Sequence, residues 1–115
     1  MRFVSAIALA GCVVLAGCNS LKPPTPLDQL NEAQSHGHFV FQGHCSTCHE
    51  ERKDDRLHGP SLAGVFQKKY LPSGAPATDE RVTNTVIHGR TNMPAMGEQL
   101  SDEEIHDLLA YLHTL

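Results

Sequence analysis

The segment Cys45-Ser46-Thr47-Cys48-His49 constrains this chain more than any other feature. Two cysteines separated by two residues and followed directly by a histidine form the attachment pattern of a c-type haem. Each thiol can add across one vinyl group, and the spacing lets both reach neighbouring edges of one ring. The adjacent imidazole can then bind the iron from below the ring. We therefore expect one covalent haem c held by Cys45 and Cys48, with His49 as an axial ligand.

Two other sites use similar residues. A Cys-x-x-Cys pair can be a redox dithiol, although such a pair normally follows a strand, and no strand pattern precedes Cys45. The pair can also be half of a zinc site, with two further ligands supplied by histidines such as His36 and His38. Both alternatives stay open at this point.

The first residues read as a targeting signal. Residues 3–17 are almost wholly apolar and follow a lone Arg2, and they fall short of the roughly 20 residues that a membrane-spanning helix needs. The letters LAGC at 15–18 resemble the lipobox of bacterial lipoproteins, in which the cysteine is lipidated. An upstream copy at 9–12 would leave an apolar new terminus, so we favour Cys18. An ordinary secretory signal and a permanent membrane helix are the alternatives.

This interpretation divides the chain into a signal peptide at 1–17, a lipidated proline-rich tether at 18–27 and a folded domain at 28–115. Three prolines within residues 23–26 favour an extended tether, which would span roughly 28 Å and hold the domain clear of the lipid head groups. The protein would lie outside the cytoplasmic membrane of a bacterium, in the periplasm. Asn19 after the lipidated cysteine favours the outer membrane over the inner one.

Charge narrows the range of partners. The chain has 9 basic and 13 acidic side chains, and removal of residues 1–17 takes away only Arg2. No basic patch is present, so a nucleic acid is not expected as a partner. A mildly acidic surface suits docking to a basic patch on another redox protein. We expect redox partners of a respiratory or dehydrogenase chain, and a monomer.

A first helix is predicted from about residue 28 to the haem motif. Apolar residues three or four positions apart form one face: Leu30, Ala33, Gly37, Val40 and Phe41. A glycine in mid-helix costs close to 1 kcal/mol relative to alanine. We therefore expect another helix to approach closely at Gly37.

The last helix has the clearest start. Ser101 and Glu104 have the spacing of a capping box, and Leu100 and Ile105 that of a hydrophobic staple. The apolar face then continues to the end of the chain through Leu108, Leu109 and Leu112.

Two weaker elements lie between these helices. A short helical segment is predicted at 61–67 after Pro60, and a helix at 79–88 that ends at Gly89. Residues 68–77 read as a loop. No stretch alternates like a strand for more than a few residues, so the fold class is all-α.

A second axial ligand is expected in the segment 92–97. Pro94 keeps Met93 extended and prevents a helix there. Met96, beside Gly97 on more pliable chain, is the second choice and otherwise a core filler. Among the eight histidines, His88 is the strongest rival. The others are expected to be solvent-facing: His36, His38, His44, His58, His106 and His113.

From residue 37 to its end the chain resembles the class I c-type cytochromes with a single haem. The matching residues are Gly37, Phe41, Cys45, Cys48, His49, 59–62, 93–95, 100–105 and 111–112. The resemblance implies a small cytochrome c fold in which the N- and C-terminal helices cross around one covalent haem, near Gly37 and Tyr111.

The resemblance also implies roles for single residues. His49 is the proximal ligand and Met93 the distal one, and the Pro60 carbonyl accepts a hydrogen bond from the other imidazole nitrogen. Leu62 and Phe66 pack on the haem.

Two features depart from the family. The chain has no tryptophan to contact a haem propionate, and Arg81, Arg90 or Tyr70 could replace it. The segment 50–58 is unusually charged and could contact a specific partner.

Two protein ligands leave the iron coordinatively saturated, which favours electron transfer over catalysis. We expect a membrane-tethered one-electron carrier between redox enzymes rather than an enzyme. The alternatives are a haem subunit bound permanently to an oxidase, reductase or dehydrogenase, and a ligand-binding haem protein in which Met93 dissociates.

Overall fold

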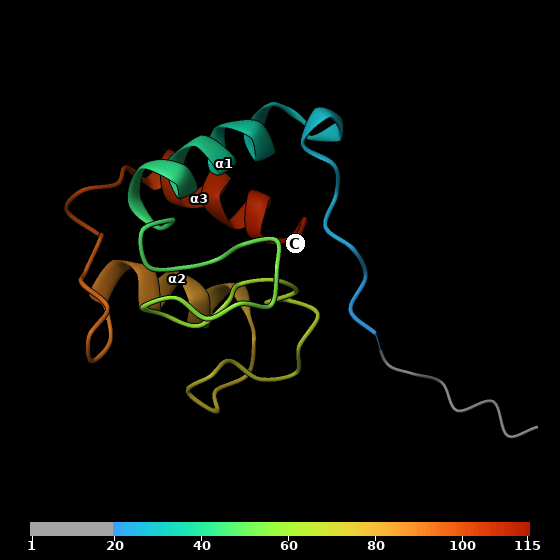
Figure 1. Ribbon diagram of the computed structural model, residues 1–115. Coiled ribbons are helices and arrows are strands. Elements are labelled where there is room, and N and C mark those ends of the chain that lie inside the picture. Colours follow the sequence, from blue (N-terminus) through green and yellow to red (C-terminus); the bar gives the residue numbers. More distant parts are fainter. Residues whose placement is uncertain (1–19) are drawn as a thin grey trace, which may run out of the picture.

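The computed structural model describes residues 20–115 and contains three α-helices with no strand in that range (Figure 1). They are α1 (Glu32–His44), α2 (Asp79–His88) and α3 (Asp102–Leu112), preceded by the short 3-10 helix η1 (Leu27–Gln29). The all-α fold class is confirmed. Helices α1 and α3 pack on each other, and long loops around α2 complete the domain.

The expected signal peptide and the lipidation site Cys18 lie outside the described residues. Within the described range, no helix has the length and apolar character that crossing a bilayer demands.

Helix α1 begins later than predicted. Asn31 caps it, because the Asn31 side chain accepts from the backbone N–H of Gln34 at 2.9 Å and the Gln34 side chain accepts from the Asn31 N–H at 3.0 Å. The preceding Leu30 is extended, with φ −70° and ψ 141°, so η1 cannot run on into the helix. The expected start at residue 28 was therefore wrong by one helical turn. Its buried face is as predicted, with Gly37, Val40 and Phe41 inside.

Helix α2 begins and ends as the sequence indicates, and α3 begins as predicted but ends at Leu112 rather than at the end of the chain. The capping box of Ser101 and Glu104 is present, and the two staple residues Leu100 and Ile105 are both buried. The predicted helix at 61–67 is instead a turn. Gly64 has φ +63°, in the left-handed region, which interrupts any helix there.

The crossing of α1 and α3 depends on Gly37. A Cβ atom at this position would overlap the backbone carbonyl of Asp107 and approach the Tyr111 Cβ to 2.9 Å. The two helices therefore touch backbone to backbone, as expected. One residue before the crossing, His36 Nδ1 lies 2.8 Å from the Asp107 carboxylate, and this hydrogen bond raises the pKa of His36.

The segment at 20–27 packs against the domain, so it is not the free tether that the sequence suggested. The Thr25 N–H donates to the Thr114 carbonyl at 2.8 Å, and the Arg52 guanidinium donates to the Thr25 carbonyl at 2.8 Å. The Gln67 side-chain amide bonds both backbone groups of Lys22. We call residues 20–27 the arm; it runs beside the C-terminus (Figure 1).

Replacement of Gly37 by alanine is expected to lower the free energy of unfolding by about 1–3 kcal/mol, because the new methyl group must push the two helices apart. Gly43 is the matched control, since it lies on the same helix and a Cβ there meets nothing within 4 Å. Gly43→Ala should leave stability unchanged or raise it by up to about 1 kcal/mol. Chemical denaturation of both variants measures the difference, and equal effects would contradict the close crossing.

Candidate haem site

The end of α1 positions the Cys-x-x-Cys-His motif. Cys45 is the C-cap residue, and its N–H still donates to the Phe41 carbonyl at 2.8 Å. The N–H groups of Cys48 and His49 both donate to the Cys45 carbonyl, at 3.0 and 2.9 Å. The motif is therefore a tight turn that continues from the helix. A rigid helix anchored at the Gly37 crossing thus carries all three functional side chains.

The two cysteines are partly buried and form no disulfide. Burial, together with the neighbouring Cys48 and Glu51, raises the pKa of the Cys45 thiol to about 11. Reactive dithiols show the opposite shift, because the thiolate is their working form. The dithiol alternative is thus disfavoured. No group of three or more metal-binding side chains exists within residues 20–115, which disfavours the zinc alternative as well.

His49 is oriented by a backbone carbonyl. Its Nδ1 lies 2.8 Å from the Pro60 carbonyl oxygen, which can only accept, so Nδ1 carries the proton. The other ring nitrogen, Nε2, then holds the free lone pair that a metal needs. Gly59 lies against the same ring, since a Cβ there would come within 2.5 Å of His49 Cε1. The predicted contact between Pro60 and His49 is present.

The loop 89–100, which we call the methionine loop, is fixed at its start by a tight turn. Arg90 and Met93 exchange two backbone hydrogen bonds, at 3.0 and 2.7 Å, and Thr91 between them has φ +48°. Gly89 has φ +70°, and a Cβ there would come within 2.5 Å of the Met93 carbonyl. Both backbone polar groups of Met93 are therefore bonded within this turn.

Met96 is held as firmly as Met93. Its N–H donates to the Val86 carbonyl at 2.9 Å, and its own carbonyl accepts from Gln99 and Leu100. The expectation of a more pliable chain around Met96 was wrong. Both methionine side chains are half-buried and pack on the core.

The histidines other than His49 lie in different surroundings, and some of them contact other side chains. His113 is exposed, as expected, although its ring stacks on Phe66 with centroids 3.9 Å apart and lies 2.7 Å from the Asp79 carboxylate. His38 packs on Tyr111 at a centroid distance of 5.0 Å. His44, His58 and His106 are exposed, as expected. His88 is the exposed last residue of α2.

The charged segment after the motif turns partly inward, which sequence reasoning missed. Glu51 is only 9% exposed and accepts hydrogen bonds from the Tyr111 hydroxyl and from Gln42 Nε2. Burial and the bond to Glu51 raise the pKa of Tyr111. Arg52 contacts the arm, whereas residues 53–58 are exposed. Only this last part of the segment is free to meet a partner.

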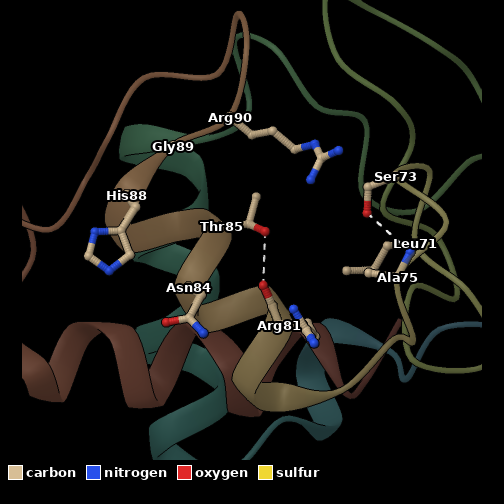
Figure 2. A pocket seen from close by; sticks show the side chains of 9 residues that line it. All are labelled: Leu71, Ser73, Ala75, Arg81, Asn84, Thr85, His88, Gly89 and Arg90. Atoms are coloured by element: carbon tan, nitrogen blue, oxygen red, sulfur yellow. Dashed lines mark hydrogen bonds between the residues drawn. The ribbon is translucent and has the colours of Figure 1, made fainter.

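A cationic pocket of about 240 Å³ lies beside the methionine loop, between α2 and residues 71–75. Figure 2 shows the Arg81 and Arg90 side chains at opposite sides of this pocket. Tyr70 does not line it and is 53% exposed. Of the three candidates for a propionate contact, the two arginines line one pocket and Tyr70 does not.

Comparison with known proteins agrees with the haem site described above. The family model described as cytochrome c oxidase, cbb3-type, subunit III matches residues 32–112. A cytochrome c6-like protein of Nostoc sp. is 32% identical over 94 residues, covering 82% of this chain and 78% of that protein. The chain belongs to the class I c-type cytochromes with a single haem.

Other relatives of this cytochrome agree. Cytochrome c6 of Thermosynechococcus vestitus is 29% identical over 111 residues, covering 96% of this chain and 88% of that one. The crystal structure of cytochrome c6 from the diatom Phaeodactylum tricornutum superposes with a TM-score of 0.54 at 31% identity, covering 69% of this chain and 88% of that chain. The cytochrome carries one covalent haem c and transfers electrons.

The residues present fit this haem. Two cysteines that form no disulfide stand at the attachment spacing, one imidazole nitrogen is free for iron, and the absence of a side chain at Gly59 leaves room for the His49 ring. When bound, the haem supplies the one-electron Fe(III)/Fe(II) couple. The protein's part is to hold the His49 imidazole in a fixed orientation.

Gly89→Ala is expected to disrupt the methionine loop, because the added Cβ would clash with the Met93 carbonyl and Ala95 N–H. Gly74→Ala is the matched control: Gly74 has φ +82°, but a Cβ there meets nothing within 4 Å. Both variants place a side chain on a residue with positive φ, which costs about 1–3 kcal/mol. Amide exchange at Met93 should accelerate only in Gly89→Ala; acceleration in both would attribute the effect to backbone strain alone.

Proposed function

We propose that this cytochrome is a membrane-tethered one-electron carrier with a six-coordinate haem. Cys45 and Cys48 form the thioether links, His49 is the proximal ligand and Met93 the distal ligand. The carrier is anchored by lipid at Cys18.

The observation that carries the proposal is the hydrogen bond between His49 Nδ1 and the Pro60 carbonyl. It fixes the ring orientation and leaves Nε2 for the iron, and it makes the imidazole a stronger ligand. Leu62 and Phe66 follow Pro60 and pack against the core, where they would contact the haem. A saturated iron has no open position for oxygen or peroxide, which favours electron transfer over a ligand-binding role.

Met93 is the better distal ligand on structural grounds. Its turn is closed by the paired bonds to Arg90, and the following Pro94 disfavours a helical conformation at Met93 itself. Met96 instead begins the turn that leads to α3, because its carbonyl accepts from Gln99 and Leu100. We assign Met96 to packing.

Met93→Leu keeps the side-chain volume but removes the sulfur. We expect loss of the methionine–iron charge-transfer band in the oxidised protein and a fall in reduction potential on the order of 100 mV or more, since axial ligands set the potential. Met96→Leu is the control and should keep both. The opposite pattern would assign the ligand to Met96. A band retained in both variants would mean that either methionine can bind the iron, which would contradict a specific role of Met93, and a band absent from the unaltered oxidised protein would exclude methionine ligation.

The proposed location is outside the cytoplasmic membrane of a bacterium. The LAGC motif at 15–18 supports lipidation at Cys18, and Asn19 favours the outer membrane. The excess of acidic over basic side chains suits docking to basic patches on redox proteins of a respiratory or dehydrogenase chain.

A second candidate is a haem subunit bound permanently to an oxidase, reductase or dehydrogenase. The matched family model supports it, because its description is that of an oxidase subunit. In this role electron transfer would occur within a catalytic complex.

Intact mass of the membrane-extracted protein tests the anchored form. We expect a chain beginning at Cys18 with acyl groups and one haem; a mass equal to the unmodified 115 residues would contradict all three. Purification in mild detergent separates the two candidates. A carrier should elute alone, whereas an enzyme present in equal amount after salt washing would favour the subunit role.

A further inference from the structure

The arm is bound to the domain at two points. The Lys22 N–H donates to Gln67 Oε1 at 2.7 Å, and Gln67 Nε2 donates to the Lys22 carbonyl at 3.1 Å and to the Leu115 carbonyl at 2.8 Å. Three residues on, Thr25 is bonded through both of its backbone groups, to Thr114 and Arg52. The arm therefore follows the surface of the domain from residue 22 onward.

Apolar packing adds to these bonds. Leu21 lies over Gly64, where a Cβ atom would come within 2.9 Å of Leu21 Cδ1. Pro24 and Thr25 are half-buried. A segment with three prolines loses little backbone entropy on docking, so a few hydrogen bonds suffice to hold it.

This docking shortens the free chain between lipid and protein. Only three residues, 19–21, separate Cys18 from Lys22. Four steps of fully extended chain span at most about 14 Å, compared with the roughly 28 Å expected of a free tether. The polar head-group layer is itself about 5–7 Å thick. The docked Lys22 can therefore lie no more than about 9 Å beyond the head-group surface.

The free chain between Cys18 and Lys22 is too short for the domain to rotate so that its opposite side faces the membrane. A domain of about 90 residues has a radius of gyration of about 12 Å, so its far side lies more than 25 Å from the docking point. Figure 1 shows the arm and the C-terminus on one side of the domain and the methionine loop on the other.

We infer that the arm orients the cytochrome on the membrane. The side formed by the arm, Gln67 and the C-terminal Leu115 rests on the lipid surface, and the methionine loop points away from it. This inference rests on the proposed anchor at Cys18. The partner of the arm side is the lipid surface itself, and the methionine side is left free for a redox protein that projects from the membrane or is dissolved.

Docking of the arm is measured by amide exchange in the haem-loaded protein extracted in mild detergent. The Lys22 N–H should exchange at least about tenfold more slowly than an unprotected amide. Gln67→Ala should remove this protection, whereas Gln29→Ala, a change at an exposed glutamine of η1, should not. Unprotected exchange at Lys22 in the unaltered protein would overturn the docking.

Orientation is measured by electron paramagnetic resonance of the oxidised haem in stacked, oriented membranes. The signal of the lipidated protein should vary several-fold with the angle between membrane and field. A twelve-residue Gly-Ser insertion between Asn19 and Ser20 should abolish this dependence, because it adds about 19 Å of flexible reach. The reduction potential of the haem in this insertion variant should stay the same as in the unaltered protein.

The outcomes separate the inference from the proposed function. An angle-independent signal from a protein whose mass shows acyl groups would overturn the orientation and leave the anchor standing. A mass without acyl groups would overturn both. An angle dependence that survives the insertion would mean that surface contacts, rather than the short arm, orient the domain, and would also count against the inference.

Discussion

The backbone contact between α1 and α3 at Gly37 is the constraint on which the rest of the structure depends. Because no side chain separates the helices there, the position of α1 is determined by the carbonyl of Asp107 and by Tyr111. Helix α1 ends in the haem attachment turn, and α3 begins where the methionine loop ends. The crossing therefore sets the relative positions of the two segments that provide the proposed iron ligands. A small domain with few aromatic residues gains from such a fixed contact, because it can bury little apolar surface otherwise.

A buried polar cluster joins the same crossing to the haem motif. Glu51, two residues after His49, accepts from the Tyr111 hydroxyl and from Gln42, so α1, α3 and the segment after the motif share one carboxylate. A buried carboxylate is tolerated only when its oxygens are bonded, and here both are. The neighbouring Arg52 extends the connection to the arm.

Features that depend on neighbouring residues could be predicted from the sequence, whereas contacts between residues far apart along the chain could not. The cap of α3 and the stop of α2 at Gly89 depend on residues within four positions, and both were predicted. The cap of α1 at Asn31 and Gln34 has the same spacing, so it could have been predicted from the same rule. By contrast, the turn at 61–67 depends on the left-handed Gly64, which Leu21 covers. Docking of Lys22 on Gln67 joins residues 45 positions apart, and burial of Glu51 on Tyr111 joins residues 60 apart. No pattern of neighbouring residues indicates such pairs. Within the candidate site, the attachment motif could be predicted because its chemistry lies in five adjacent residues.

Helix α3 runs between the methionine loop, which precedes it, and the residues at the C-terminus that contact the arm. Its first turn is fixed to the methionine loop by the staple of Leu100 and Ile105, and Thr114, two residues after its end, is bonded to the arm. Eleven helical residues span about 16 Å. Because a helix of this length is stiff and is also clamped at Gly37, it keeps the arm and the methionine loop apart at a fixed distance. The arm is bonded to Thr114 just after α3 as well as to the loop residues Gln67 and Arg52, so a force on the proposed anchor would reach the same helix that holds the methionine loop.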